Sequence, residues 1–129
     1  MQMPNRYLIL EDEPLIAMDL KFAFEDAGAD AATASSCLEA IGEIERDHLR
    51  GAVLDVNLGQ GETCEAAAKR LTEENIPFVL HTGDLNRVGE FMRSLGAPIL
   101  GKPRAADDVI SFVMNLVEEG GGTARPDRA

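Results

Sequence analysis

Residues 8–14 read Leu-Ile-Leu-Glu-Asp-Glu-Pro, so three apolar residues lead directly into three acidic ones and a proline. A short apolar run is typical of a buried strand, and proline suits the first turn of a helix. Beyond the proline, four apolar residues recur at helical spacing: Ile16, Leu20, Ala23 and Ala27. Gly28 then predicts the end of this helix. The stretch predicts a strand, an acidic loop and an amphipathic helix in succession.

The same alternation continues along the chain. The apolar runs predicted as strands are residues 7–10, 31–34, 52–54, 77–80 and 98–100, each followed by a candidate helix. The last helix has one apolar stripe, formed by Val109, Phe112, Val113 and Leu116. The helix between Asp84 and Ser94 has few apolar anchors and is expected to be short or mobile. Five such repeats predict an α/β fold, a doubly wound five-stranded parallel sheet covered on both faces.

Length and composition limit the class of protein. The 129 residues predict one domain over 1–119 and a flexible tail over 120–129, which is glycine-rich and lacks an apolar pattern. No apolar run approaches the roughly 20 residues that cross a bilayer, and no secretory signal is evident, so we expect a cytoplasmic protein without membrane contact. The net charge of −11 argues against binding to nucleic acid. Cys37 and Cys64 match no metal or redox motif and indicate reduced structural thiols.

Polar side chains suited to phosphate chemistry follow four of the predicted strands. Glu11 and Asp12 follow the first strand, Asp55 the third, Thr82 the fourth and Lys102 the fifth. In a parallel sheet the carboxyl ends of the strands share one edge, and α/β proteins bind ligands there. We therefore expect these five residues to meet in one site.

The charges in this site indicate a metal. Two carboxylates about 4 Å apart repel by about 4 kcal/mol at an effective dielectric of about 20, and a divalent cation relieves this repulsion. Mg²⁺ fits best because it accepts a few protein oxygens and completes its shell with water and phosphate oxygens. Asp55 can then act as a nucleophile and form an aspartyl phosphate. Lys102 and Thr82 would hold the phosphoryl oxygens, and Gly83 would leave room for the phosphate.

Four segments together resemble the CheY-like receiver domain of response regulators. They are residues 8–14, 53–58 (Val-Leu-Asp-Val-Asn-Leu), 81–83 (His-Thr-Gly) and 100–103 (Leu-Gly-Lys-Pro). The match extends from residue 6 to about 119. The resemblance implies a flavodoxin-like (βα)5 fold with strand order 2-1-3-4-5 and a cis peptide bond between Lys102 and Pro103.

The resemblance also implies roles for single residues around the phosphoryl group. It makes Asp55 the phosphoacceptor and places Thr82 and Lys102 in contact with the phosphoryl group. Val56 and Gly83 would contribute to phosphate binding.

The metal ligands follow from the same resemblance. Mg²⁺ would be bound by Asp12, by Asp55 and by the backbone carbonyl of Asn57. Glu11 would act mainly through a metal-bound water. Mg²⁺ is the one cofactor that the resemblance implies.

The function implied is that of a stand-alone, single-domain response regulator in two-component signal transduction. This phosphoprotein would receive its phosphoryl group from a histidine kinase or a histidine phosphotransfer protein of a phosphorelay. It would then bind an unknown downstream protein or act as a phosphate sink. It would catalyse only its own phosphorylation and dephosphorylation, so it is not expected to be a turnover enzyme, and we expect a monomer or weak dimer.

The first predicted helix meets the kinase or phosphotransfer helices in similar receivers. Leu15, Met18 and Phe22 lie off the main core stripe of this helix. Two interpretations stay open from the sequence. These residues form an exposed docking surface, or they belong to a broad stripe that is simply buried.

Three features depart from the family pattern. Gly59 stands where many receivers have proline, which predicts a more mobile loop. The segment over residues 82–102 is somewhat short, and Ile99 replaces an aromatic residue that commonly swings on activation. Because a compact β-branched side chain cannot make that swing, we expect activation to act through residues 82–94.

Two alternative functions use related chemistry. A phosphatase of the haloacid-dehalogenase type needs a second Asp two residues after the nucleophile, where Asn57 stands here, and the chain has no room for a cap domain. An interaction module with a decayed site is disfavoured because the whole site is present. His81 could suggest a phosphohistidine, but its place between Leu80 and Thr82 favours a structural role, and His48 resembles an ordinary helix-end residue.

Overall fold

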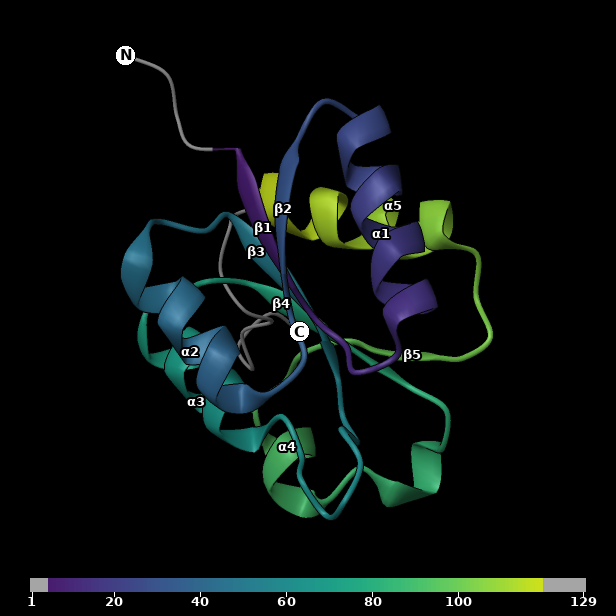
Figure 1. Ribbon diagram of the computed structural model, residues 1–129. Coiled ribbons are helices and arrows are strands. Elements are labelled where there is room, and N and C mark those ends of the chain that lie inside the picture. The colour runs from purple at the N-terminus through teal and green to yellow at the C-terminus, as the bar shows by residue number, and fades with distance from the viewer. Residues whose placement is uncertain (1–4, 120–129) are drawn as a thin grey trace.

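The computed structural model describes residues 5–119, which form a five-stranded sheet between two layers of helices (Figure 1). The strands are β1 (Arg6–Leu10), β2 (Asp30–Ala34), β3 (Gly51–Asp55), β4 (Phe78–Thr82) and β5 (Ile99–Gly101). The helices are α1 (Pro14–Asp26), α2 (Cys37–Arg46), α3 (Glu65–Glu73), α4 (Glu90–Ser94) and α5 (Ala106–Glu118), with a 3-10 turn, η1, at Leu85–Arg87. All neighbouring strands are parallel and their order is β2-β1-β3-β4-β5, so the predicted architecture and strand order are confirmed.

The alternation of side chains along the strands divides the core into two layers. One layer faces α2, α3 and α4, and its strand residues include Leu8, Leu10, Leu54, Phe78 and Leu80. The other faces α1 and α5, and its strand residues include Tyr7, Ile9, Val53, Val79 and Leu100. Figure 1 shows α1 and α5 on one face of the sheet and α2 and α3 on the other.

Two predicted strands began one residue too early, at Pro77 and Pro98. Proline has no N–H to give to the strand ladder, so each of these residues only precedes its strand. The carbonyl of Pro77 still accepts a hydrogen bond from Ala52 N at 3.1 Å. At their other ends, β3 and β4 extend further than expected, because the pairing continues through Asp55 and Thr82. These two polar residues are therefore part of the sheet.

The first helix ends in a cap that depends on Gly28. Gly28 N donates to Glu25 O at 2.9 Å and Ala29 N donates to Phe24 O at 3.0 Å, which is the pairing of a Schellman motif. Gly28 has a φ of +88°, a conformation that glycine adopts without a steric penalty. The predicted stop is therefore confirmed, with the last helical residue two positions earlier.

Two of the predicted core positions are wrong. Ala27 lies beyond the end of α1 and is exposed, and Phe24 is the buried residue instead. Phe24 stacks on Tyr7 with ring centroids 4.6 Å apart. In α5, Phe112 is 41% exposed and Ile110 is buried in its place, because the face toward the sheet is rotated from the predicted stripe.

The segment between β4 and β5 is short, as expected. It contains only η1 and the five-residue helix α4. Val88 and Met92 are buried, whereas Leu85 and Phe91 remain exposed. This segment is therefore held to the core by few apolar contacts.

Several smaller predictions concern single positions. The Lys102–Pro103 peptide bond is cis, as expected. Cys37 and Cys64 are both buried free thiols. The longest helices within residues 5–119, α1 and α5 with 13 residues each, are too short to span a bilayer. The predicted flexible tail lies outside the described residues.

Candidate functional site

The carboxyl edge of the sheet brings three carboxylates together. Glu11 and Asp12 follow β1 directly, Asp55 is the last residue of β3, and β1 and β3 are neighbours in the sheet. One carboxylate oxygen from each residue lies within 4.8 Å of the other two. Glu11 and Asp55 are buried, and Asp12 is half-buried. The cluster therefore concentrates negative charge at the edge where the sequence predicted a site.

The alternation along the strands explains which further side chain joins the cluster. Glu11, Asp55, His81 and Lys102 continue the rows that face α1 and α5. Lys102 Nζ accordingly lies 3.1 Å from Glu11 Oε1 and 3.4 Å from Asp55 Oδ2. Lys102 thus contacts two of the three carboxylates, and its shorter contact is with Glu11.

Burial and charge shift the ionisation of both partners. Burial, followed by the hydrogen bond and charge of Glu11, raises the pKa of Asp55 to about 7, although Lys102 acts in the opposite direction. Burial lowers the pKa of Lys102, but Glu11 and Asp55 more than offset this, so its net pKa is raised. The lysine is thereby held as an ammonium beside an aspartate that resists ionisation.

The side chain of Thr82 lies on the face of the sheet opposite to that of Asp55 and Lys102, and its hydroxyl is hydrogen-bonded to the backbone of Asp84. The hydroxyl accepts a hydrogen bond from Asp84 N at 3.1 Å and donates one to Asp84 O at 3.3 Å. The carbonyl of Thr82 accepts from Lys102 N at 2.7 Å, which fixes the start of the β5–α5 loop against β4. A phosphoryl contact would require the hydroxyl to turn away from Asp84.

Three further predicted residues lie just after β3 and β4. Asn57 N donates to Asp55 Oδ1 at 3.3 Å, and this holds one carboxylate oxygen. Val56 is buried, and its carbonyl accepts from Cys64 N at 3.2 Å. Gly83 is exposed, and no atom of residues 5–119 lies within 4 Å of the place a Cβ would take. The packing around position 83 therefore does not require glycine, and the space beside Gly83 is open.

The loop after β3 forms a turn that the sequence analysis missed. An isolated antiparallel bridge joins Asn57 to Thr63, and Glu62 N donates to Gly59 O at 2.9 Å. Gly59 has a φ of +87°, which proline cannot adopt, and a Cβ there would lie 3.3 Å from Asp12 Oδ2. The loop thus rests against a carboxylate of the cluster. The triplet at 59–61, Gly-Gln-Gly, was the signal for such a turn.

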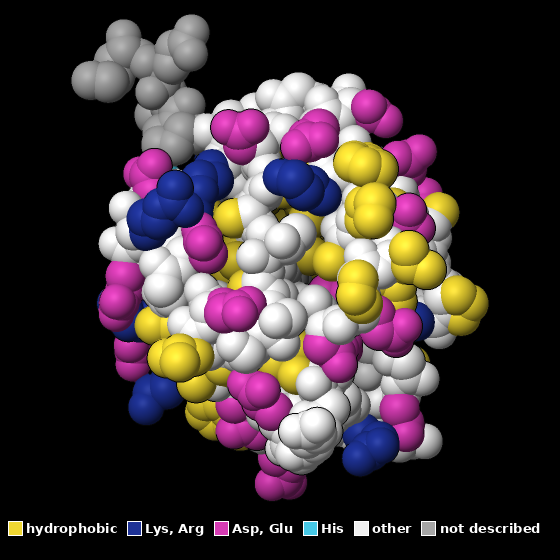
Figure 2. All heavy atoms as spheres, viewed as in Figure 1, with side chains coloured by type: hydrophobic (Ala, Val, Ile, Leu, Met, Phe, Trp, Pro, Cys, Tyr) yellow, Lys and Arg dark blue, Asp and Glu magenta, His cyan; other side chains and the backbone are white. Residues whose placement is uncertain are grey.

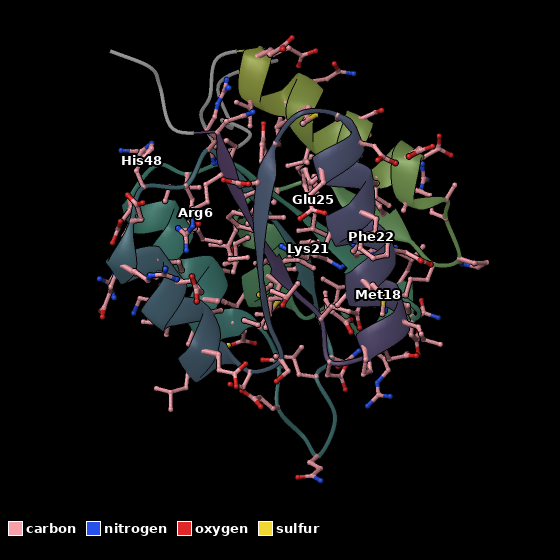
Figure 3. All side chains as sticks on the ribbon, turned by 45° about the horizontal axis from the view of Figure 1, so that its top comes forward. Arg6, Met18, Lys21, Phe22, Glu25 and His48 are labelled. Atoms are coloured by element: carbon pink, nitrogen blue, oxygen red, sulfur yellow. The ribbon has the colours of Figure 1, made fainter. Side chains whose placement is uncertain are left out.

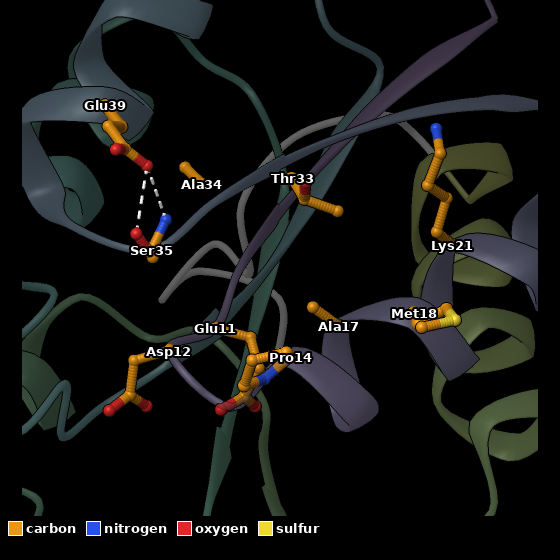
Figure 4. Close-up of a pocket in the computed structure, with 10 residues that line it drawn as sticks. All are labelled: Glu11, Asp12, Pro14, Ala17, Met18, Lys21, Thr33, Ala34, Ser35 and Glu39. Atoms are coloured by element: carbon orange, nitrogen blue, oxygen red, sulfur yellow. Dashed lines mark hydrogen bonds between the residues drawn. The ribbon is translucent and has the colours of Figure 1, made fainter.

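A hollow of about 380 Å³ opens beside the carboxylates, between α1 and the segment after β2 (Figure 4). Glu11 and Asp12 line it at one end, and Met18 and Lys21 of α1 line it further along. On the opposite wall, the Glu39 carboxylate accepts hydrogen bonds from the backbone N and the hydroxyl of Ser35. The acidic cluster is therefore approachable from the α1 side.

The donor set of the cluster fits a hard cation. Carboxylate oxygens are the ligands that Mg²⁺ prefers, and partly exposed Asp12 leaves room for the waters that Mg²⁺ retains. No histidine or cysteine joins these three acids in the region that the structure describes, so the cluster lacks the ligands typical of zinc. Burial is the main cause of the raised pKa of Asp55, and the neighbouring charge of Glu11, which a cation would offset, raises it further.

Comparison with solved structures places this fold among known proteins. The solution structure of SdrG from Sphingomonas melonis Fr1 is 32% identical, with a TM-score of 0.75, over 92% of this chain and 99% of that one. A response regulator receiver protein from Sinorhizobium medicae WSM419 is 25% identical, with a TM-score of 0.76, over 89% and 95% of the two chains. A CheY-like receiver domain protein from Methanospirillum hungatei JF-1 matches in fold at 20% identity and a TM-score of 0.79, over 91% and 96%.

The chain belongs to the CheY-like response-regulator receiver family. The sheet order and the identity to SdrG over nearly the whole chain support this assignment. No protein-family model and no curated protein matches the sequence.

Proposed function

We propose that this receiver domain is a phosphorylation switch in a two-component phosphorelay, with Asp55 as the phosphoacceptor. The observation that carries the proposal is the setting of Asp55, which ends β3 between two other carboxylates with the Lys102 ammonium 3.4 Å away. A carboxylate nucleophile, a metal-binding acid cluster and a cation are the groups that transfer of a phosphoryl group to Asp requires. A histidine kinase or a histidine phosphotransfer protein would supply the phosphoryl group.

In the proposed step, a carboxylate oxygen of Asp55 attacks the phosphorus of a phosphohistidine. The new O–P bond forms as the N–P bond breaks, and the electron pair stays on the imidazole nitrogen, which solvent then protonates. Lys102 offsets negative charge on the transferred oxygens, and Thr82 donates a hydrogen bond to one of them after leaving Asp84. Water later hydrolyses the aspartyl phosphate, so the chain catalyses only its own phosphorylation and dephosphorylation.

Asp12, Asp55 and the carbonyl of Asn57 would hold Mg²⁺ directly, and Glu11 would act through a bound water. The ion would offset the charge of the carboxylates and of the phosphoryl oxygens. Asp55 needs this counter-charge, because burial and the neighbouring Glu11 raise its pKa, and a protonated carboxyl group cannot attack.

The phosphoryl donor would dock on α1. Leu15 is 75% exposed, Met18 43% and Phe22 53%, so the interpretation that these three residues are buried is wrong. Figure 2 shows hydrophobic side chains gathered over α1, and Figure 3 shows Met18 and Phe22 on its outer side. This apolar ridge adjoins the acidic cluster, because Met18 and Asp12 line the same hollow. A donor helix packed on the ridge would therefore bring its histidine close to Asp55.

Phosphorylation by a small donor tests the assignment of Asp55. Phosphoramidate with Mg²⁺ should add one phosphoryl group to the wild type and none to Asp55→Asn, as measured by intact mass. Equal labelling of both proteins would show that Asp55 is not the acceptor. The phosphorylated form would then bind a downstream protein or serve as a phosphate sink.

A further inference from the structure

The turn after β3 is tied to the amino-terminal end of α2 by a side chain that the proposed function does not use. The carboxylate of Glu62 accepts a hydrogen bond from Cys37 N at 2.9 Å. Cys37 is the first residue of α2, so its N–H has no partner inside the helix. The N-cap residue, Ser36, accepts from Glu39 N instead. Glu62 therefore supplies a partner that the cap of the helix does not provide.

A second contact joins the same two elements. The thiol of Cys37 donates a hydrogen bond to Thr63 O at 3.1 Å. Because Glu62 and Thr63 are neighbours, the first residue of α2 holds the turn at two consecutive positions. Cys37 is buried, whereas Glu62 is exposed. A substitution of Glu62 can therefore remove one of the two contacts without opening the core.

The backbone of Glu62 fixes the peptide group that carries a proposed metal ligand. Leu58 N donates to Glu62 O at 2.9 Å, beside the bridge between Asn57 and Thr63. The carbonyl of Asn57 and the N–H of Leu58 belong to one trans peptide group, in which they point in opposite directions. A hydrogen bond that fixes the N–H therefore fixes the direction of the carbonyl as well.

The tip of this turn is costly to order. Residues 59–61 are all exposed, and all three have a positive φ, including Gln60 at +53°. A residue other than glycine is uncommon in this region, and the flanking glycines lose much conformational freedom when the turn forms. The order of the turn therefore depends on contacts at its ends, and the bond from Cys37 N to Glu62 is one of them.

We propose that Glu62 is a positioning residue for the metal site. Through its bond to Cys37 N it holds the turn, and with it the carbonyl of Asn57, in the place where Mg²⁺ would need it. The inference rests on the metal site of the proposed function and gives Glu62 no contact with the ion or the phosphoryl group. Loss of the side-chain bond should lower the affinity for Mg²⁺, because binding would then have to order the turn.

Calorimetric titration with Mg²⁺, at a temperature where every variant is folded, tests the proposal. Glu62→Ala should weaken Mg²⁺ binding by about threefold to tenfold, which corresponds to the loss of one hydrogen bond. Glu62→Gln keeps an oxygen acceptor without the charge and should recover most of the lost affinity. Glu65→Ala removes the same charge from an exposed position in the first turn of α3, and it should bind like the wild type.

Amide hydrogen exchange in Mg²⁺-free buffer gives a second readout that does not depend on the ion. In Glu62→Ala, exchange at Cys37 N and Leu58 N should accelerate by about threefold to tenfold, because the first loses its acceptor and the second lies in the released turn. Exchange at Leu54 N, inside β3, should be unchanged. A general loss of stability would accelerate exchange at all three positions.

The outcomes separate this inference from the proposed function. Unchanged Mg²⁺ affinity of Glu62→Ala, beside a wild type that binds the ion, would overturn the positioning role and leave the metal site intact. Equal weakening by Glu62→Ala and Glu62→Gln, or by Glu65→Ala, would also overturn it, because charge alone would then explain the effect. Faster exchange throughout β3 would show a merely structural role. A wild type that binds no Mg²⁺ would refute the metal site and this inference with it.

Discussion

The hydroxyl of Thr82 is bound to the backbone of Asp84, accepting from its N at 3.1 Å and donating to its O at 3.3 Å. Thr82 is fully buried at the end of β4, so its hydroxyl can turn toward a phosphoryl group only by giving up these bonds. The segment that follows, residues 84–94, has two buried apolar side chains, Val88 and Met92. Weakly anchored segments are the ones that shift when a local charge change favours a second conformation.

We therefore predict that activation moves residues 84–94. Beryllofluoride, a phosphoryl mimic, added with Mg²⁺ should produce large backbone NMR shifts across this segment, and Mg²⁺ alone should not. Thr82→Ala should lose most of these shifts while Asp55 can still be labelled. Changes confined to the immediate site, or centred on α1, would contradict this route.

The raised pKa of Asp55 predicts an unusual dependence of stability on pH in Mg²⁺-free buffer. An Asp with a folded-state pKa of about 7, above the usual value of about 3.9, stabilises the folded state while protonated and loses that contribution as pH rises through 7. Asp55→Asn, which stays neutral, should exceed the wild type in free energy of unfolding by roughly 1–3 kcal/mol at pH 8. The difference should shrink as pH falls from 7 toward 4.

Urea unfolding at several pH values measures this difference. Asp19→Asn is the matched control, because Asp19 is an exposed acid on α1 outside the cluster. It should show no comparable dependence on pH. An Asp55→Asn variant that is less stable than the wild type at pH 8 would mean that Lys102 outweighs the repulsion from Glu11.

We predict that a side chain larger than glycine at position 59 weakens Mg²⁺ binding through a steric contact with Asp12. Gly59→Ala should cost about 1–2 kcal/mol of stability for its positive φ and should also weaken Mg²⁺ binding, because the new Cβ presses on Asp12. Gly61→Ala carries a similar backbone cost at a φ of +79°, but its Cβ meets no atom of the described part of the chain within 4 Å. It should therefore bind Mg²⁺ like the wild type.

Calorimetric titration with Mg²⁺ compares the two glycine variants, with Asp12→Asn as the reference for a lost ligand. Gly59→Ala should fall between Asp12→Asn and the wild type in affinity. Equal Mg²⁺ affinity of the two alanine variants would show that the contact with Asp12 is irrelevant to the metal.

The ridge on α1 is predicted to matter for protein donors and not for small ones. Phe22→Ser should slow phosphotransfer from a purified histidine kinase by roughly ten- to a hundredfold, because an exposed aromatic anchor is removed. Labelling by phosphoramidate should be unchanged. Leu38→Ser removes an equally apolar residue that is 81% exposed on α2, and it should affect neither reaction. Equal slowing by both substitutions would show that the ridge on α1 is not the docking surface.

Much of the fold could be predicted because its signals are local. Apolar runs and helical spacing lie within a few residues of one another, and a parallel sheet follows from their order. Errors arose where backbone chemistry or helix rotation overrode that pattern. Pro77 could not donate to the ladder, and Phe112 was turned from the sheet by the packing of α5.

For the candidate site, the sequence predicted which residues lie together at the carboxyl edge of the sheet. Glu11, Asp12 and Asp55 were each recognisable as polar ends of strands, and the parallel sheet brings them together. The turn at residues 59–61 was missed, although Gly59 and Gly61 are visible in the sequence. Its contact with Asp12 joins two segments that are distant along the chain, so the sequence pattern could not reveal it.

The sequence by itself determined the order of strands and helices and the chemical character of each strand end, since both are properties of neighbouring residues. The tertiary structure alone decided that Lys102 contacts Glu11, 91 positions away along the chain, and that Thr82 binds Asp84. It also decided that the ring nitrogens of His81 are buried without a hydrogen-bond partner among residues 5–119. Side-chain partners depend on how distant elements pack and rotate against the sheet. Periodicity specifies which face of an element is apolar, but not which neighbour covers it.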